Sequence, residues 1–150
     1  MPETLLVHAT TVAIGGRAML LRGPSGSGKS DLALRLIDAG ARLVADDRSE
    51  LRRHGDAIVV CAPETIAGLI EARGIGILRV ASLASAELAL IVDLVSPEAV
   101  ERLPEPRSET ILGLAIPLIA LAAFEASAPA KLRLALDALA GGRSSTRLQR

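Results

Sequence analysis

The sequence predicts a single α/β domain with a mixed, mostly β core, and three observations lead to this prediction. The run Gly23–Ser30 reads G-x-x-x-x-G-K-S and lies between an apolar strand pattern and a helical pattern. Three short β patterns precede it, which excludes the strand–helix–strand opening of a Rossmann fold. The chain has 150 residues, half of them hydrophobic, and this is enough to bury one core.

Short apolar runs predict the elements around the glycine-rich run. The first strands are expected over Thr4–Ala9, Thr11–Ile14 and Ala18–Leu21, with a tight turn at Gly15-Gly16. The helical pattern then covers Leu32–Ile37, and Gly40 is expected at its C-terminal cap. Apolar runs bounded by turn residues predict the later strands, over Arg42–Ala45, Glu50–Arg53, Ala57–Cys61 and Leu88–Val92, with one or two more within Ile111–Ala122.

Two more helices are expected in the second half of the chain. A short one is predicted over Pro97–Leu103, followed by a polar loop over Pro104–Glu109. A clearer one is predicted over Pro129–Leu139, because proline is favoured in a first helical turn. Its expected apolar face holds Leu132, Leu136 and Leu139. The basic run Gly141–Arg150 reads as a flexible tail, so the domain is expected to end near residue 140.

Composition excludes several classes of function. The formal net charge is zero and the chain has one Phe and no Trp or Tyr, which argues against nucleic-acid binding. The single Cys61 lies in an apolar run and is expected to be a core residue. The apolar run Ile111–Phe124 contains Pro117 and is shorter than the roughly 20 residues of a membrane span, so we interpret it as buried strand and turn. We expect a soluble, cytoplasmic protein.

The glycine-rich run predicts a phosphate-binding loop. Its glycines allow successive backbone N–H groups to surround a polyphosphate at the positive end of a helix. Lys29 would reach the β- and γ-phosphates and the Ser30 hydroxyl would bind Mg²⁺. The alternative is a flexible turn between a strand and a helix. The nucleotide-binding residues predicted in this way are Gly23, Pro24, Ser25, Gly26, Ser27, Gly28, Lys29 and Ser30.

Two sets of carboxylates could complete such a site. Asp46 and Asp47 end the strand after the loop helix, and Asp93 ends the apolar strand of the second half. Successive side chains of an extended segment point to opposite faces, so one carboxylate of the pair could bind metal while the other acts as base. The alternatives are a solvated turn, or Asp93 as the metal-side carboxylate.

Other residues gain interest from their positions. His8 lies in a strand that could carry it beneath the phosphates, although a lone histidine there is more often structural. Glu71 and Arg73 would share a face of an extended segment, and Gly74 and Gly76 follow them. A surface ion pair is the simpler interpretation of that pair.

Together these residues resemble the catalytic domain of HPr kinase/phosphorylase, a bacterial family that phosphorylates a serine of the phosphocarrier HPr. The resemblance rests on His8, the phosphate loop, the run Leu43–Asp47 and the run Ile70–Ile77, and it covers most of the chain. It implies the nucleotide-binding fold that this family shares with phosphoenolpyruvate carboxykinase. It also implies a short form of the family, of the type found in alphaproteobacteria.

The resemblance implies a role for each matching residue. Lys29 would contact the phosphates, and Ser30, Asp46 and Glu71 would hold Mg²⁺. Asp46 or Asp47, with preference for Asp47, would take the proton from the target serine. His8 would complete the phosphate site, and Arg102 lies about where the family has a catalytic arginine.

The chain also departs from the family pattern. Pro24 replaces a common acidic residue, and Ala122–Ser127 stands where the family has an Arg-Pro-Gly-Arg-type run tied to dephosphorylation. The sequence therefore favours kinase over phosphorylase activity. The expected function is ATP- and Mg²⁺-dependent phosphorylation of an HPr-type carrier by a homo-oligomer, hexameric by resemblance. The alternatives are a small-molecule kinase or nucleoside triphosphatase, and a nucleotide-gated regulator without catalysis.

Overall fold

Three short strands open the computed structural model, which describes residues 3–140. They are β1 (Thr4–Val7), β2 (Ala9–Ile14) and β3 (Arg17–Arg22). The expected first strand is thus interrupted at His8, which forms a bend between β1 and β2. Gly15 and Gly16 both have positive φ, as the tight turn between β2 and β3 requires. These three strands precede the phosphate loop, as predicted.

Helix α1 (Lys29–Asp38) follows the loop and ends at a glycine cap. Gly40 has a φ of 110°, and the N–H groups of Gly40 and Ala41 donate to the carbonyls of Ile37 and Leu36. This hydrogen-bond pattern is the Schellman motif, in which glycine adopts the left-handed conformation that other residues avoid. The predicted cap at Gly40 is confirmed.

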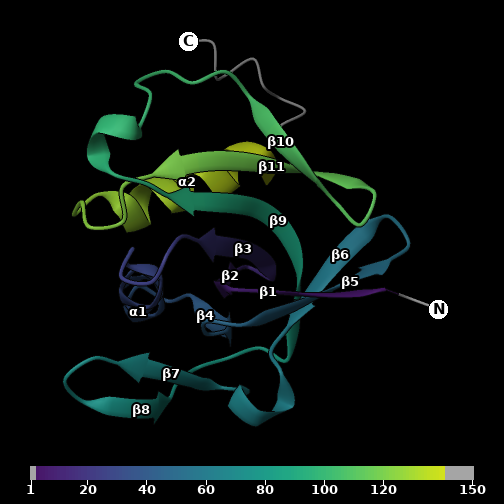
Figure 1. Ribbon diagram of the computed structural model, residues 1–150, viewed down its shortest axis with the longest axis vertical. Coiled ribbons are helices and arrows are strands. Elements are labelled where there is room, and N and C mark those ends of the chain that lie inside the picture. The colour runs from purple at the N-terminus through teal and green to yellow at the C-terminus, as the bar shows by residue number, and fades with distance from the viewer. Residues whose placement is uncertain (1–2, 141–150) are drawn as a thin grey trace.

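The middle of the chain is a run of strands, of which those within 42–61 were predicted and the hairpin within 69–79 was not. Strand β4 (Arg42–Ala45) is followed by the hairpin of β5 (Ser49–His54) and β6 (Ala57–Cys61). A 3₁₀ turn, η1 (Glu64–Ile66), then leads to a second hairpin of β7 (Leu69–Ala72) and β8 (Gly76–Arg79). This hairpin forms its own two-stranded sheet and lies apart from the main sheet (Figure 1).

The long strand β9 (Ser85–Leu94) is the centre of the main sheet. One edge of β9 pairs in parallel with β3, while the other pairs with β6 at its start and with β11 (Leu114–Leu121) at its end. The path of the sheet runs β1-β5-β6-β9-β3-β2-β4, with β10 and β11 joined through β9. Parallel and antiparallel pairs occur together, which confirms the predicted mixed core.

The segment after β9 differs from the prediction. The helix expected over Pro97–Leu103 is only a 3₁₀ turn, η2 (Pro97–Ala99), and the loop expected over Pro104–Glu109 contains the start of β10 (Arg107–Ile111). Strand β10 owes its conformation to backbone pairing with β11, which no pattern within its own polar sequence indicates. The predicted buried strand within 111–124 is confirmed as β11.

Helix α2 (Ala128–Ala140) confirms the predicted last helix. Leu132 and Leu136 are fully buried, whereas Leu139 is 37% exposed, so the predicted apolar face was wrong at its last position. Leu139 lies in the final turn, beyond the residues that pack on the sheet. The predicted tail over 141–150 lies outside the described residues. Within 3–140, neither helix is long and apolar enough to cross a bilayer.

Apolar side chains cover both faces of the sheet. On one face, alternate residues of β3 and β9 pack against α1 and α2, with Met19, Leu21, Leu90 and Val92 among them. The intervening residues face the other way, into a second cluster made with β5, β6, β10 and β11. Burial on both faces explains why these central strands are continuously apolar instead of alternating.

Candidate functional site

The loop Gly23–Gly28 joins the end of β3 to the start of α1. Gly26 and Gly28 have φ of 84° and 99°, conformations that favour glycine. The Lys29 ammonium folds back over the loop and donates to the carbonyls of Gly23 at 2.6 Å and Pro24 at 3.2 Å. The loop therefore surrounds the Lys29 ammonium, the group that the sequence predicts to contact the phosphates.

Two features of this loop fit a bound polyphosphate. The Ser27 hydroxyl oxygen is buried and has no hydrogen-bond partner among the described residues, which is costly unless a ligand satisfies it. A Cβ atom at Gly23 would overlap that same oxygen, so only glycine allows Ser27 to pack there. The loop also lies at the amino end of a ten-residue helix, where backbone N–H groups lack intrahelical partners.

Asp46 connects the loop helix to two other elements. Its Oδ1 accepts hydrogen bonds from Ser30 Oγ at 2.6 Å and Thr10 Oγ1 at 3.1 Å. Its Oδ2 accepts from the backbone N–H of Glu71 at 3.0 Å. Asp46 is only 9% exposed, so burial and three donors hold its carboxylate in one orientation. Of the candidate carboxylates, Asp46 therefore contacts the loop serine.

Asp47 lies on the opposite side of the chain from its neighbour. Its φ is 68°, in the left-handed region that Asp tolerates better than most residues, and its N–H donates to Thr10 Oγ1 at 3.0 Å. The Asp47 side chain is exposed. The two carboxylates are separated, but by a bend after β4 and not by the extended strand that the sequence predicted: Asp46 is buried at the loop, and Asp47 faces solvent. The Thr10 hydroxyl, on β2, forms hydrogen bonds with both residues, and no pattern in the sequence predicted this role.

Glu71 lies on β7 with its backbone at Asp46 and its side chain exposed, whereas Arg73 lies in the turn after β7. Both residues are exposed and Ala72 between them is buried, the alternation that the expected shared face requires. Residues 3–140 contain no group of three His, Cys, Asp or Glu side chains arranged to bind a metal. Mg²⁺ in phosphoryl-transfer sites commonly takes only one or two protein ligands and completes its shell with phosphates and water.

His8 and Arg102 stand at the margins of this group. Ala9 pairs with Arg22, so continuing that register places His8 opposite Gly23, the first loop residue. His8 is exposed and forms no side-chain hydrogen bond within the described residues. Arg102 is exposed in the segment between η2 and β10, and no ion pair or hydrogen bond within residues 3–140 ties it to the loop.

Asp93, the alternative metal-side carboxylate, is bound by an arginine. Arg22 donates from Nε to Asp93 Oδ1 at 2.8 Å and from Nη2 to Asp93 Oδ2 at 3.1 Å. The same guanidinium donates to both oxygens of Glu109 at 2.8 Å. These hydrogen bonds lower the pKa of Glu109 below its usual value. The network joins the ends of β3 and β9 to the strand β10. Since Asp93 is bound by Arg22, Asp46 is the candidate carboxylate that contacts the loop.

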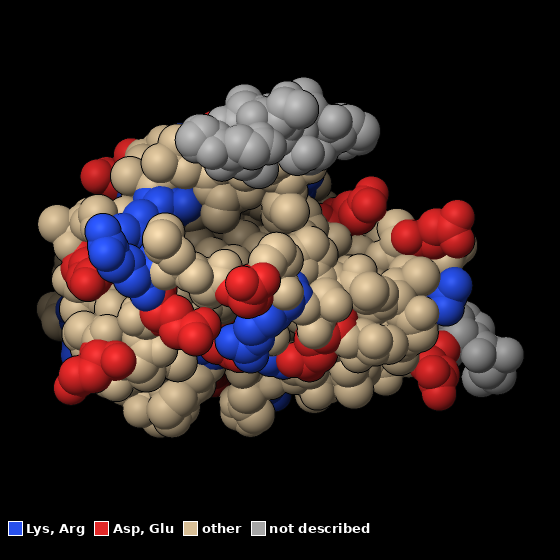
Figure 2. Space-filling model, turned by 90° about the horizontal axis from the view of Figure 1, so that it is seen from above, with Lys and Arg blue, Asp and Glu red and all other residues tan. Residues whose placement is uncertain are grey.

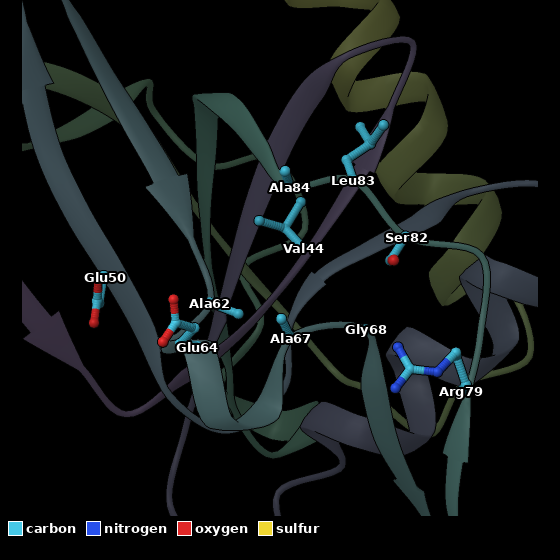
Figure 3. Close-up of a pocket in the computed structure, with 10 residues that line it drawn as sticks. All are labelled: Val44, Glu50, Ala62, Glu64, Ala67, Gly68, Arg79, Ser82, Leu83 and Ala84. Atoms are coloured by element: carbon cyan, nitrogen blue, oxygen red, sulfur yellow. The ribbon is translucent and has the colours of Figure 1, made fainter.

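A cavity of about 540 Å³ opens elsewhere, between η1, the β7–β8 hairpin and the sheet (Figure 3). Glu50 and Glu64 lie on one side of it and Arg79 on the other. None of the predicted site residues lines this cavity. On the face of the molecule seen from above, acidic and basic side chains are interspersed (Figure 2), in keeping with a net charge of zero.

Comparison with known proteins extends these observations. The family model "HPr Serine kinase C-terminal domain" matches residues 1–132. HPr kinase/phosphorylase of Halalkalibacterium halodurans is 49% identical over 84 residues, and that of Exiguobacterium sibiricum is 48% identical over 84 residues. Each alignment covers 55% of this chain and 27% of the relative. The chain therefore matches about a quarter of the length of these curated relatives.

A solved structure is similar over nearly the whole chain. It is described as the Hpr(Ser) kinase/phosphatase from Coxiella burnetii, with a TM-score of 0.82 and 28% sequence identity. The similarity covers 96% of this chain and 98% of that one. The fold predicted around the phosphate loop is thereby confirmed.

Proposed function

Because the chain belongs to the HPr serine kinase C-terminal domain family, we propose that it phosphorylates a serine of an HPr-type phosphocarrier protein with ATP and Mg²⁺. The observation that carries the proposal is the contact of Ser30 Oγ with Asp46 at the loop, with Asp47 exposed beside it. A kinase needs a phosphate cradle, a metal-side carboxylate and an accessible base, and these residues have the chemistry for all three.

The loop residues Gly23–Ser30 would hold the nucleotide, with Lys29 on its phosphates. Ser30, Asp46 and Glu71 would hold Mg²⁺ through oxygen atoms, the ligands this ion prefers. When bound, ATP would supply the phosphoryl group that is transferred, and Mg²⁺ would neutralise part of the charge of that group. The unpartnered Ser27 hydroxyl and the clustered donors of the loop support this assignment.

Asp47 would accept the proton of the target serine hydroxyl. The substrate is a folded protein, so its serine can reach only a carboxylate that protrudes from the surface, and Asp47 is exposed whereas Asp46 is buried. Asp46 is buried and its oxygens already accept three hydrogen bonds, so they are not open to a substrate hydroxyl. Asp46 would therefore orient the metal side.

We extend the proposal to His8 and Arg102 as residues that contact phosphate. The β2–β3 register at the first loop residue supports His8. For Arg102 the support is the family resemblance, because a cation there would neutralise charge on the transferred group. The chain carries Ala122–Ser127 in place of the Arg-Pro-Gly-Arg-type run, so the activity we assign to it is that of a kinase. An assay with inorganic phosphate as acceptor tests separately whether the chain also catalyses phosphorolysis.

We also propose that residues 1–140 form the catalytic domain and that the protein is cytoplasmic and self-associates. Light scattering on the purified chain tests the last of these, because a monomer and a homo-oligomer differ at least two-fold in mass.

The test of the main proposal is transfer of label from ATP to a purified HPr-type carrier in the presence of Mg²⁺. We expect label on a carrier serine with the wild type and loss of label with Lys29→Ala. The matched control is Lys131→Ala, which changes the only other lysine of the chain, on the surface of α2. If the wild-type chain binds ATP but does not label the carrier, the proposal is wrong. The chain would then be a kinase with a small-molecule acceptor or a regulator without catalysis.

A further inference from the structure

A second cavity, which we call the Phe124 cavity, adjoins the phosphate loop. It has a volume of about 540 Å³, and its walls include Pro24 and Ser27 of the loop, Val95 and Pro97 after β9, and Phe124 after β11. These walls are mostly apolar. None of the residues assigned above to metal binding or proton transfer lines it. The cavity therefore does not suit Mg²⁺ or a serine hydroxyl, and its walls suit an apolar group.

The topology of the sheet explains where the cavity lies. Strands β3, β9 and β11 are parallel neighbours, and the segments that follow them all contribute to the cavity wall. Ligands of open α/β sheets bind in the crevice outside the carboxyl ends of such strands. On the other side of β3, beyond β2, the end of β4 carries Asp46. The loop thus lies between a carboxylate side and an apolar side.

Phe124 has a conformation that leaves its ring available to a ligand. It is the only Phe of a chain without Trp or Tyr, yet 69% of it is exposed. A Cβ atom added to Gly28 would come within 2.9 Å of Phe124 Cζ, so the ring lies against the first residues of α1. Arg35 of α1 donates to the carbonyls of Ala123 and Glu125, on either side of Phe124. The ring is therefore held at the loop by a fixed turn.

We propose that the Phe124 cavity binds the purine base of the nucleotide and that the Phe124 ring stacks on it. This inference rests on the proposed function, because it concerns the nucleotide whose phosphates the loop binds. Ser30 and Asp46 mark the metal end of the loop, where the β- and γ-phosphates belong. The nucleoside must leave from the opposite end, and there the apolar walls and the aromatic ring replace the water that would otherwise cover the base.

Tryptophan fluorescence provides a direct test, because the chain has no Trp or Tyr of its own. In Phe124→Trp, we expect ATP to quench the indole emission and inorganic tripolyphosphate to leave it unchanged. The matched control is Leu134→Trp on α2, since Leu134 is 68% exposed and lies outside the cavity. ATP should not quench that indole. Equal quenching of the two indoles by ATP, or no quenching of either, would overturn the proposal.

Binding to Phe124→Ala separates the base from the phosphates. Loss of one stacking partner should weaken ATP binding about ten-fold and leave tripolyphosphate binding unchanged. Because the ring is largely exposed, the substitution leaves the core intact. Unchanged or tighter ATP binding would overturn the proposal, as would an equal loss of both ligands. If the wild-type chain binds tripolyphosphate and ATP with equal affinity, the base site is wrong but the proposed function stands. If it binds neither ligand, the proposed function is wrong as well.

Discussion

Ser30 Oγ donates a hydrogen bond of 2.6 Å to Asp46 Oδ1, which joins the first turn of α1 to the end of β4. The other oxygen of Asp46 accepts from the backbone of Glu71, so a third element, β7, meets at the same carboxylate. Asp47 follows in the chain but faces solvent. One buried carboxylate therefore organises the site, and its exposed neighbour remains accessible to a substrate.

Exchange of each carboxylate for an amide separates these two roles. Asp47→Asn should reduce phosphotransfer to the carrier about 10²–10⁴-fold, the usual contribution of a general base, with ATP affinity retained. Asp46→Asn should instead weaken Mg²⁺-dependent nucleotide binding. Titration of ATP with and without Mg²⁺ beside the transfer assay measures both effects. Full activity in Asp47→Asn would remove that residue from the proton transfer.

Alanine substitutions at Gly26 and Gly28 test whether backbone conformation or lack of space requires glycine at these positions of the loop. Gly26→Ala should cost about 1–2 kcal/mol in the free energy of unfolding, the penalty for a side chain in a left-handed conformation. Gly28→Ala should cost more, because its Cβ would also come within 2.9 Å of Ala123 and Phe124, whereas a Cβ at Gly26 meets nothing. Urea denaturation measures the difference. Equal losses would show that conformation alone selects glycine at both positions.

The Arg22 network predicts a pH dependence of stability. Hydrogen bonds from Arg22 lower the pKa of Glu109 in the folded state, so the stabilisation is fully present above the unfolded-state pKa of about 4.5. It is lost as the pH falls through the lower, folded-state pKa. Glu109→Gln should lower Tm at pH 7 by at most about 2–4 °C, because the Glu109 side chain is 37% exposed and solvent screening limits such a pair to ~1 kcal/mol or less.

The pH profile supplies the control for that variant. The difference in Tm between wild type and Glu109→Gln should shrink as the pH falls through the lowered pKa of Glu109, because wild-type Glu109 then becomes neutral as well. Thermal unfolding at a series of pH values measures it. A difference in Tm that stays constant over the whole acid range would mean that the ionised form of Glu109 contributes no stability.

Cys61 should react slowly with alkylating reagents. Burial, and after it the neighbouring Glu50 carboxylate, raise the pKa of the Cys61 thiol, so less thiolate is present at about pH 8 than in an exposed cysteine. Iodoacetamide labelling followed by mass spectrometry should be slower for the folded chain than for the chain in urea. Glu50→Gln should speed the folded-state reaction, and a slower reaction in that variant would contradict the assigned cause.

Local patterns predicted the parts of this protein that depend on local chemistry. The loop Gly23–Ser30, the cap at Gly40 and the paired Asp46 and Asp47 follow from residue type and short-range spacing, and the structure confirms the loop geometry, the cap and the strand end. The family resemblance was likewise carried by short motifs. The roles assigned to the site residues, His8 and Arg102 among them, remain predictions.

Long-range pairing decided what the sequence could not. Strand β10 forms in a polar segment because β11 supplies its hydrogen bonds, and Arg22 joins Asp93 to Glu109 because three strands end together. The exposed ring of Phe124 lies at the loop because Arg35 holds its turn, although the two residues are far apart in the chain. The sequence by itself determined the loop and its carboxylates, since each lies within one or two adjacent elements. Only the tertiary structure decided which carboxylate meets Ser30 and what lines the cavity beside the loop, because those contacts join segments whose sequences carry no mark of one another.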